Sequence, residues 1–281
     1  MASTVDLHIH TTASDGSDFP ELLLKNLTGA GITTFAVTDH DTIDGALEME
    51  KLVTAEFRFI RGIEFSCQSP AGKCHILGYG FDPSHPAFLT ALEEGRLLRQ
   101  EKLETRIQYL RSELGIELTA EENRWLRSLK SSGKPHFGKI VVNHGLADSI
   151  DTAIQKYINP CIVLRDRIEA ETAVTAILAA GGIPVWAHPL GGEGEKRLTV
   201  DRFHAQLETL LGYGIRGLEC HYSRYETHDR EFLTSQAKQH NLLISGGSDY
   251  HGTNKQNLEL GQLSADGKAV APESLSILAA L

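Results

Sequence analysis

Val5-Asp6-Leu7-His8-Ile9-His10 alternates apolar and polar residues, which is the period of a β-strand. Residues two apart on a strand share a face, so the imidazoles of His8 and His10 leave one face and the apolar side chains leave the other. A histidine pair at the end of such a strand predicts a metal site built on a barrel strand. The alternative for this stretch by itself is a polar strand edge with incidental histidines, and the rest of the chain decides between the two.

The composition bounds the class of protein. The chain has 281 residues, of which 41% are hydrophobic, enough for a large core and too many for a disordered chain. The sequence has no apolar run long enough to span a membrane, and we expect no export signal, because the N-terminal residues show no basic start followed by an apolar stretch. The four cysteines form no Cys-x-x-Cys pair. We therefore expect a cytoplasmic protein with reduced thiols and no membrane partner. The net charge of −10 argues against duplex DNA but not against a small anion, because bound metal cations can dominate a local field.

Strands and helices alternate along most of the chain. Strands are expected at 5–10, 34–38, 57–67, 73–80, 183–187, 215–220 and 242–245, and helices at 20–30, 43–55, 169–180, 200–211, 226–239 and 272–281. The third and fourth strands are joined by a Pro-Gly turn, so we expect them to pair antiparallel. The alternation indicates an α/β fold with a mainly parallel sheet, near the eight-stranded barrel in size but one strand short.

A different composition fills the middle of the chain. From Pro86 to Ile158 the sequence is charged and has helical spacing, with a long helix expected from Phe88 to Leu114. We interpret residues 86–158 as a helical insertion over the active site of a barrel domain formed by residues 1–85 and 159–281. The charged run inside the long helix is interpreted as a solvated face.

Histidines and carboxylates recur at the ends of the predicted strands, where βα barrels gather their catalytic residues. Nine such residues are candidate metal ligands: His8, His10, Asp15, His40, Glu64, His75, His188, Asp249 and His251. The set offers nitrogen and oxygen but no thiolate, which suits Mn, Fe or Zn rather than a structural zinc site. Nine ligands are too many for one ion, so two or three divalent cations are expected, with Mn first. Such centres suit phosphoester hydrolysis.

Six segments that carry these residues resemble, in order, the motifs of the PHP (polymerase and histidinol phosphatase) family. They are Asp6–His10, Thr38–Asp41, Gly62–Ser66, His75–Tyr79, Ala187–Pro189 and Gly246–Gly252. The resemblance implies a distorted (β/α)7 barrel with a helical insertion and a trinuclear centre, with Glu64, Asp249 and His188 among its catalytic groups. It implies one metal held by His8, His10, Glu64 and Asp249, a second by Glu64, His75 and His188, and a third by Asp15, His40 and His251.

The resemblance also implies a substrate. The chain is similar to stand-alone members of the family that dephosphorylate nucleoside 3′,5′-bisphosphates, some of which trim short RNA from the 5′ end, and the segment Lys134-Pro135-His136-Phe137 is usual there. We expect a small phosphorylated nucleotide as partner, with short single-stranded RNA as a further one. His136, Lys134 and Arg224 are candidate substrate contacts. Their alternatives are a histidine that packs the insertion, for His136, and solvated cations, for the other two.

Two other functions compete with this one. A histidinol-phosphate phosphatase would use the same chemistry with a pocket for a cationic amine. A non-catalytic metal-binding module should have lost ligands, whereas every motif position here keeps one. Among single residues, Asp41 is predicted to cap the helix that begins near Ile43, with an alternative in which Asp39 and Asp41 orient His40. Cys220 is predicted to be a core residue.

Overall fold

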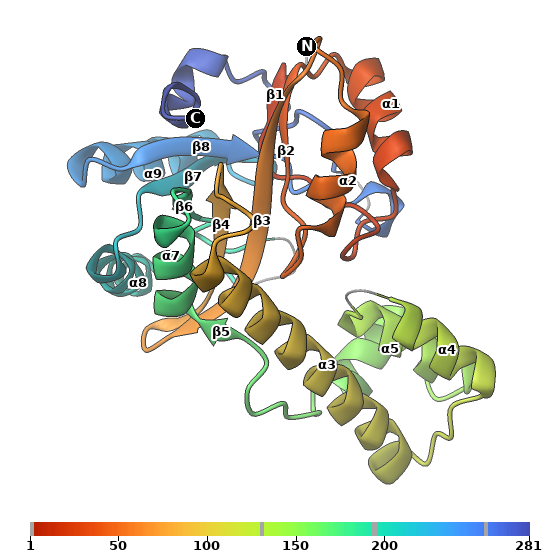
Figure 1. The fold of residues 1–281 in the computed structure, drawn as a ribbon. Coiled ribbons are helices and arrows are strands. Elements are labelled where there is room, and N and C mark those ends of the chain that lie inside the picture. The colour runs from red at the N-terminus through yellow and green to blue at the C-terminus, as the bar shows by residue number, and fades with distance from the viewer. Residues whose placement is uncertain (1–2, 130–131, 193–195, 256–257) are drawn as a thin grey trace. The chain divides into compact units, whose positions relative to one another are not determined.

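The computed structural model describes residues 3–129, 132–192, 196–255 and 258–281. The chain divides into two compact units (Figure 1). One consists of Met1–Glu93 with Ile168–Leu281, and the other of Glu94–Arg167. The first is an α/β unit, and the described residues of the second are helices and connections.

Seven strands of the α/β unit form a nearly closed barrel. Their order is β1-β2-β3-β4-β6-β7-β8, with bounds Val5–Asp6, Thr34–Val37, Arg58–Ser69, Gly72–Tyr79, Ile183–Trp186, Gly217–Tyr222 and Leu243–Gly247. The segment after β1 closes the ring against β8 and the residues that follow it: the Leu7 amide donates to the Gly246 carbonyl of β8 at 3.2 Å, and the Asp249 amide donates to the His8 carbonyl at 2.9 Å. The predicted distorted (β/α)7 barrel is confirmed.

One strand of the barrel runs against the others. β4 is antiparallel to both β3 and β6, and all other neighbours are parallel. The predicted hairpin is the cause, because only two residues separate the paired Ser69 and Gly72 and so short a loop can join only antiparallel strands. The reversal places His75, in the first half of β4, opposite Ser66 in the second half of β3.

Helices cover the outside of the barrel. α1 (Pro20–Ala30), α2 (Asp44–Leu52), α7 (Ala170–Ala179), α8 (Val200–Tyr213) and α9 (Thr227–Gln239) lie at predicted positions. α2 packs on β2 and β3, α7 on β4 and β6, and α9 on β7 and β8 (Figure 1). The bounds of α1 follow from its sequence: Pro20 needs no amide partner at the start, and Gly31 ends the helix with a φ of 74°.

The core of this region joins helix and strand side chains. Leu23 and Leu27 of α1 are fully buried in one cluster with Phe35 of β2 and Ile9. Burial of each such side chain contributes about 1.5–3 kcal/mol. The helix is thereby fixed on the barrel wall that carries the first histidine pair.

The structure differs from the predicted elements in three places. The first strand covers Val5–Asp6 rather than residues 5–10, because the Ile9 amide donates to the Thr38 hydroxyl and the His10 amide to the Tyr250 carbonyl. The short strand β5 (Ile168–Glu169), which pairs with β3, was not predicted.

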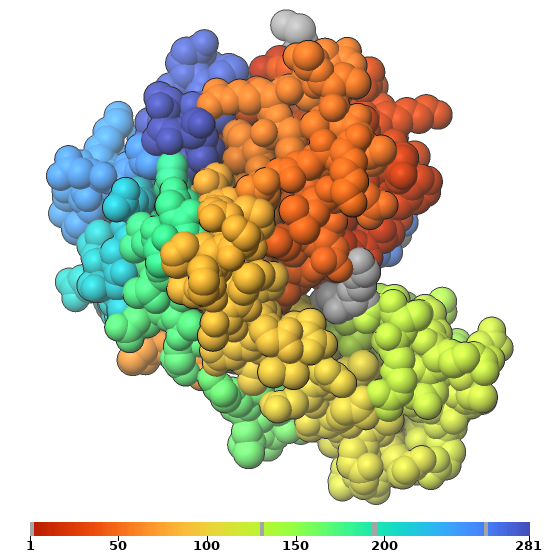
Figure 2. All heavy atoms as spheres, in the orientation of Figure 1, coloured from red at the N-terminus to blue at the C-terminus, as the bar shows by residue number. Residues whose placement is uncertain are grey.

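The third difference concerns residues 272–281, which form two 3₁₀ turns, Pro272–Ser274 and Ser276–Ala279, rather than a helix. Between the turns Leu275 leaves the helical region, and the Ser276 hydroxyl accepts a hydrogen bond from the Ile244 amide of β8 at 2.9 Å. The side chain of Arg58 donates to the Leu278 carbonyl at 2.9 Å. In Figure 2 this end of the chain, in dark blue, borders orange residues of the first unit.

The middle of the chain is helical, as predicted. The helices are α3 (Pro86–Leu114), α4 (Ala120–Ser128), α5 (Lys134–Asn143) and α6 (Ile150–Ala153), followed by a π-helical turn, Ile154–Ile158. Leu110, Leu126 and Phe137 are among the buried residues of a core of their own. No described helix, here or elsewhere, is long and apolar enough to cross a membrane.

Candidate metal centre

The rim of the barrel brings the predicted ligands together. Eight of them form three overlapping groups whose ligand atoms lie within 4.8 Å of one another: His8, His10, Glu64 and Asp249; His10, Asp15, His40 and His251; and His40, Glu64 and His75. His188 joins them through Glu64 and His75, at 3.1 and 3.3 Å from its Nε2 atom. Thus all nine residues lie in one cluster.

Glu64 of β3 stands at the centre of the cluster. Its side chain is fully buried and its two oxygens face five imidazoles. Oε2 lies 3.3 Å from His8 Nε2, 3.2 Å from His10 Nε2 and 3.0 Å from His40 Nδ1, and Oε1 lies 2.9 Å from His75 Nδ1 and 3.1 Å from His188 Nε2. This is the position from which one carboxylate can bridge neighbouring cations.

Two aspartates complete the outer groups. Asp249 Oδ1 lies 3.5 Å from His8 Nε2 and 3.3 Å from His10 Nε2. Asp15 Oδ1 lies 3.2 Å from His251 Nε2 and 3.7 Å from His10 Nδ1. The family resemblance implies Asp15, His40 and His251 as the ligands of the third metal. The structure places a fourth candidate, the imidazole of His10, in the same group.

The donor atoms of the cluster fit divalent cations. Six of them are buried without a hydrogen-bond partner: His8 Nε2, His10 Nε2, His40 Nδ1, His251 Nε2, Asp15 Oδ1 and Glu64 Oε2. A buried polar atom without a partner costs about 1–3 kcal/mol, so six directed at one another would be costly without cations between them. Imidazole and carboxylate donors suit Mn, Fe or Zn.

The charge state of the carboxylates agrees with this fit. Burial by itself would raise the pKa of Glu64, but the imidazoles of His40, His75 and His8 hold that pKa well below its usual range. Burial likewise opposes ionisation of Asp249, whereas Lys255, His251 and His8 hold its pKa low. Both groups are therefore present as carboxylates, the form that binds a cation.

Glu219 of β7 is a site residue that the sequence analysis did not assign. It is fully buried, with Oε1 at 2.9 Å from His8 Nδ1 and Oε2 accepting a hydrogen bond from the His188 amide at 2.7 Å. An Nδ1–H bond to Glu219 leaves the Nε2 lone pair of His8 directed at the cluster. The sequence did contain a signal for this residue, because Glu219 is a carboxylate on the predicted strand 215–220 of the same barrel.

Asp39 supports the loop after β1 rather than His40. Its carboxylate accepts hydrogen bonds from the amide and hydroxyl of Thr11, both at 2.7 Å, and from the Ser14 hydroxyl at 2.6 Å. Ser14 Oγ in turn lies 3.4 Å from His10 Nδ1. Asp39 therefore holds the segment that carries His10 and leads to Asp15.

The predicted helix cap at Asp41 is wrong. Ile43 occupies the N-cap position of α2, with no side-chain hydrogen bond to the helix. Asp41 Oδ1 instead accepts a hydrogen bond from the Ser66 amide of β3 at 2.8 Å. The residue has a φ of 51°, and its carboxylate contacts the neighbouring strand β3.

Two of the predicted ligands have unusual backbones. His188 and Asp249 have φ values of 28° and 60°, a region that non-glycine residues rarely adopt and that is typical of functional sites. Asp249 is held further by the Tyr222 hydroxyl and by Lys255 Nζ, each 3.0 Å from its Oδ2 atom. Tyr222 and Lys255 also escaped the sequence analysis.

The three predicted substrate contacts lie outside the metal-ligand groups. In the unit 94–167, His136 Nδ1 accepts a hydrogen bond from the Gly133 amide at 2.9 Å and so supports the start of α5, and Lys134 Nζ donates to Asn159 Oδ1 at 2.6 Å. Arg224, in the barrel unit, is exposed. Their binding to substrate stays a prediction.

Cys220 has the predicted place in the core. Its side chain is fully buried on β7, and burial raises the pKa of its thiol well above the usual range. A thiol that resists ionisation is a poor nucleophile.

Comparison with known proteins places the chain among phosphoesterases. The family model of the PHP domain matches residues 6–162. A 3′,5′-nucleoside bisphosphate phosphatase from Chromobacterium violaceum is 28% identical over 92% of this chain and 91% of the relative. A 5′-3′ exoribonuclease from Haemophilus influenzae is 31% identical over 89% of this chain and 91% of the relative. The solved structure of a candidate metal-dependent phosphoesterase from Bifidobacterium adolescentis has the same fold, with a TM-score of 0.77 and 24% identity over 95% of this chain and 94% of that one.

Proposed function

The chain belongs to the PHP family of metal-dependent phosphoesterases, and on this premise we propose that it removes a phosphate from a nucleoside 3′,5′-bisphosphate. We also propose that it trims short single-stranded RNA from the 5′ end. The observation that carries the proposal is the position of Glu64, whose two carboxylate oxygens face five imidazoles. Such a cluster suits two or three divalent cations, and hydrolysis of phosphoesters is the chemistry that such centres perform.

We propose the following ligand sets. His8, His10, Glu64 and Asp249 would hold one cation. Glu64, His75 and His188 would hold a second, and Asp15, His40 and His251 a third, with His10 beside it. Bound there, divalent cations, with Mn first and Fe or Zn as alternatives, would polarise phosphoryl oxygens and supply water of lowered pKa.

Hydrogen bonds within the chain fix the tautomers of two of the proposed histidine ligands. The Nδ1 atom of His251 lies 2.7 Å from the Asp249 carbonyl oxygen, so its Nδ1–H donates there and the Nε2 lone pair faces Asp15. Glu219 sets the same tautomer in His8. In the neutral form of each ring, the hydrogen bond at Nδ1 thereby selects the tautomer whose Nε2 atom can bind a cation.

The substrate class is supported by likeness along most of the chain. The relatives from Chromobacterium violaceum and Haemophilus influenzae, one named a bisphosphate phosphatase and the other an exoribonuclease, match 92% and 89% of this chain. His136, Lys134 and Arg224 are the proposed contacts to the substrate, since each can donate to phosphoryl oxygens. Histidinol phosphate is the competing substrate, and retention of the full ligand set argues against a module without catalysis.

We propose a cytoplasmic location. All four cysteines are free thiols, and Cys67, Cys74 and Cys220 are buried, which is typical of proteins kept in a reducing compartment.

The test is phosphate release from three substrates in parallel: adenosine 3′,5′-bisphosphate, histidinol phosphate and a 5′-phosphorylated RNA oligomer. Each is assayed with added Mn²⁺ and with a chelator. We expect chelator-sensitive release from the bisphosphate, with shortening of the oligomer. Turnover of histidinol phosphate alone would favour the competing substrate, and no release from any of them would contradict the proposal.

A further inference from the structure

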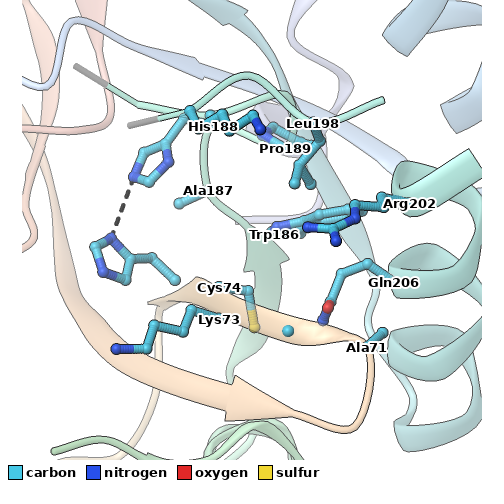
Figure 3. A pocket seen from close by; sticks show the side chains of 14 residues that line it. Ala71, Lys73, Cys74, Trp186, Ala187, His188, Pro189, Leu198, Arg202 and Gln206 are labelled. Atoms are coloured by element: carbon cyan, nitrogen blue, oxygen red, sulfur yellow. Dashed lines mark hydrogen bonds between the residues drawn. The ribbon is translucent and has the colours of Figure 1, made fainter. Parts of the chain in front are cut away.

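A cavity lies beside two of the predicted ligands in the barrel unit (Figure 3). It measures about 350 Å³, and His75 and His188 are among its lining residues. The remaining wall comes from the hairpin end of β4, from β6 with the segment that follows it, and from α8. The volume is at the lower end of the range for ligand sites, about 300–1,000 Å³, so the space suits part of a small molecule.

The lining of this cavity is cationic. Lys73, Lys196 and Arg202 line it, and no aspartate or glutamate is found among the described residues that do so. The chain as a whole carries a net charge of −10, so the sign of this surface is opposite to that of the protein. Positive side chains around a concave site raise the local concentration of anions.

Gln206 adds a buried donor to the same wall. Its side chain is 2% exposed, and its Oε1 accepts a hydrogen bond from the Ser69 hydroxyl at 3.0 Å. That bond fixes the amide orientation, yet the Nε2 atom is buried without a hydrogen-bond partner. Figure 3 shows Arg202 and Gln206 extending from α8 toward the cavity, on the side away from His188. An anionic oxygen in the cavity would give the Gln206 amide the acceptor it lacks.

We propose that this cavity binds the phosphoryl group of the substrate that does not react. The inference rests on the proposed function and adds a specificity site to it. His75 and His188 form a wall of the cavity and are proposed ligands of the metal centre, so a substrate whose reacting phosphoryl group lies at the centre can extend a second anion toward Arg202 and Gln206. A bisphosphate or the next phosphodiester of RNA provides that anion. Histidinol phosphate, whose far end is a cation, does not.

The first test compares two substrates in variants of Arg202. The measured quantity is kcat/KM for adenosine 3′,5′-bisphosphate divided by kcat/KM for p-nitrophenyl phosphate, which has no second phosphoryl group. Arg202 is exposed, so Arg202→Ala and Arg202→Glu should fold. Arg202→Ala removes a hydrogen bond to a charged group, so we expect the ratio to fall by about tenfold. We expect a larger fall in Arg202→Glu, because this variant also places a negative charge beside the anion. The matched control is Arg216→Ala, an exposed arginine outside the cavity, which should leave the ratio unchanged.

The second test measures binding directly. Calorimetric titration with 5′-AMP, with adenosine as the uncharged reference, should show weaker binding of 5′-AMP by about tenfold in Arg202→Ala and in Gln206→Glu. Unchanged selectivity and unchanged 5′-AMP affinity in Arg202→Glu and Gln206→Glu would overturn the proposal. If the unmodified enzyme does not hydrolyse the bisphosphate but its 5′-AMP affinity still depends on Arg202, the proposed substrate is wrong and the anion site stands.

Discussion

At the residue scale, we expect Glu64 to decide whether the cluster can hold cations. Glu64→Gln keeps the shape of the side chain but removes its negative charge and half of its acceptor capacity, while five imidazoles still face it. We expect metal content to fall and kcat/KM to fall by more than about 100-fold, since loss of an outer-shell partner already costs about 10–100-fold. Inductively coupled plasma mass spectrometry measures the metal content, and a phosphate-release assay measures kcat/KM.

The matched control is Glu48→Gln, an exposed glutamate of α2, which should change neither quantity. Full metal content and full activity in Glu64→Gln would contradict the assignment of Glu64 as a bridging ligand.

Glu219 permits a finer test, because it touches two proposed ligands and no phosphate contact is assigned to it. Its two oxygens serve the His8 ring and the His188 amide separately, and a glutamine offers only one acceptor oxygen. We expect Glu219→Gln to lower metal affinity by about 10–100-fold and to leave the circular dichroism spectrum unchanged. Equal metal affinity in variant and parent would show that Glu219 is only a packing residue.

The same residues show how far sequence reasoning reaches at this scale. The nine clustered residues could be predicted because eight of them belong to motifs in or after predicted strands, and the ninth, Asp15, lies in the loop after the first strand. Glu219 sits in such a strand as well, but whether a buried carboxylate binds a cation or orients an imidazole depends on distances of a few ångströms. Asp41 was misassigned for a related reason, since its hydrogen bond from the Ser66 amide of β3 is a tertiary contact that sequence spacing does not show.

At the scale of elements, β8 must approach the segment after β1 closely for the barrel to close. A Cβ atom at Gly247 would overlap the Cβ of His8 and lie 2.5 Å from its backbone nitrogen. We expect Gly247→Ala to destabilise the protein by roughly 1–3 kcal/mol and to weaken metal binding, because His8 must move. Urea unfolding and metal titration check the two effects.

The control is Gly29→Ala in α1, where a Cβ would meet nothing within 4 Å. Alanine in place of glycine in a helix should stabilise by roughly 0.5–1 kcal/mol. Similar stability changes in Gly247→Ala and Gly29→Ala would contradict the close packing of β8 on His8.

α3 carries a half-buried cation, Lys102, whose titration should be visible in stability. Burial, together with Arg106, lowers the pKa of Lys102 from 10.5 to about 8 despite its ion pair with Asp166 at 2.9 Å. Between these two values the unfolded chain holds a proton that the folded chain has released, so stability from this group rises with pH. The stability of the parent relative to Lys102→Met should therefore increase from about pH 8 toward pH 10.5, by on the order of 2–3 kcal/mol. Urea unfolding followed by circular dichroism at several pH values measures it, and a difference that is constant with pH would contradict burial of a charged Lys102.

At the scale of the whole molecule, the barrel could be predicted because its alternation and its one hairpin are local signals. The two-residue turn between β3 and β4 forces the reversal of β4, and the motifs mark the strand ends. β5 could not be found, since two residues paired with β3 carry no periodicity. The 3₁₀ turns at 272–279 escaped because the Ser276 hydroxyl prefers the Ile244 amide of β8, a tertiary contact that overrides helical spacing.

If cations occupy the cluster as proposed, we expect the stability of the whole barrel to depend on them. The proposed ligands come from the segments after β1 and β2, from β3 and β4, and from the segments after β6 and β8. The barrel closes where the Leu7 amide meets the Gly246 carbonyl, so a bound ion would connect strands on both sides of that closure. A cation that binds only the folded state stabilises it by about 2.7 kcal/mol at a free concentration 100 times its Kd. We expect Mn²⁺ to raise the unfolding temperature in scanning calorimetry and a chelator to reverse the rise.

The variants His8→Ala and Asp249→Ala should lose that response. The control is His240→Ala, which changes a histidine at the C-terminus of α9 outside the cluster and should keep the response. A response to Mn²⁺ that survives in His8→Ala and Asp249→Ala would place the stabilising ion elsewhere in the molecule.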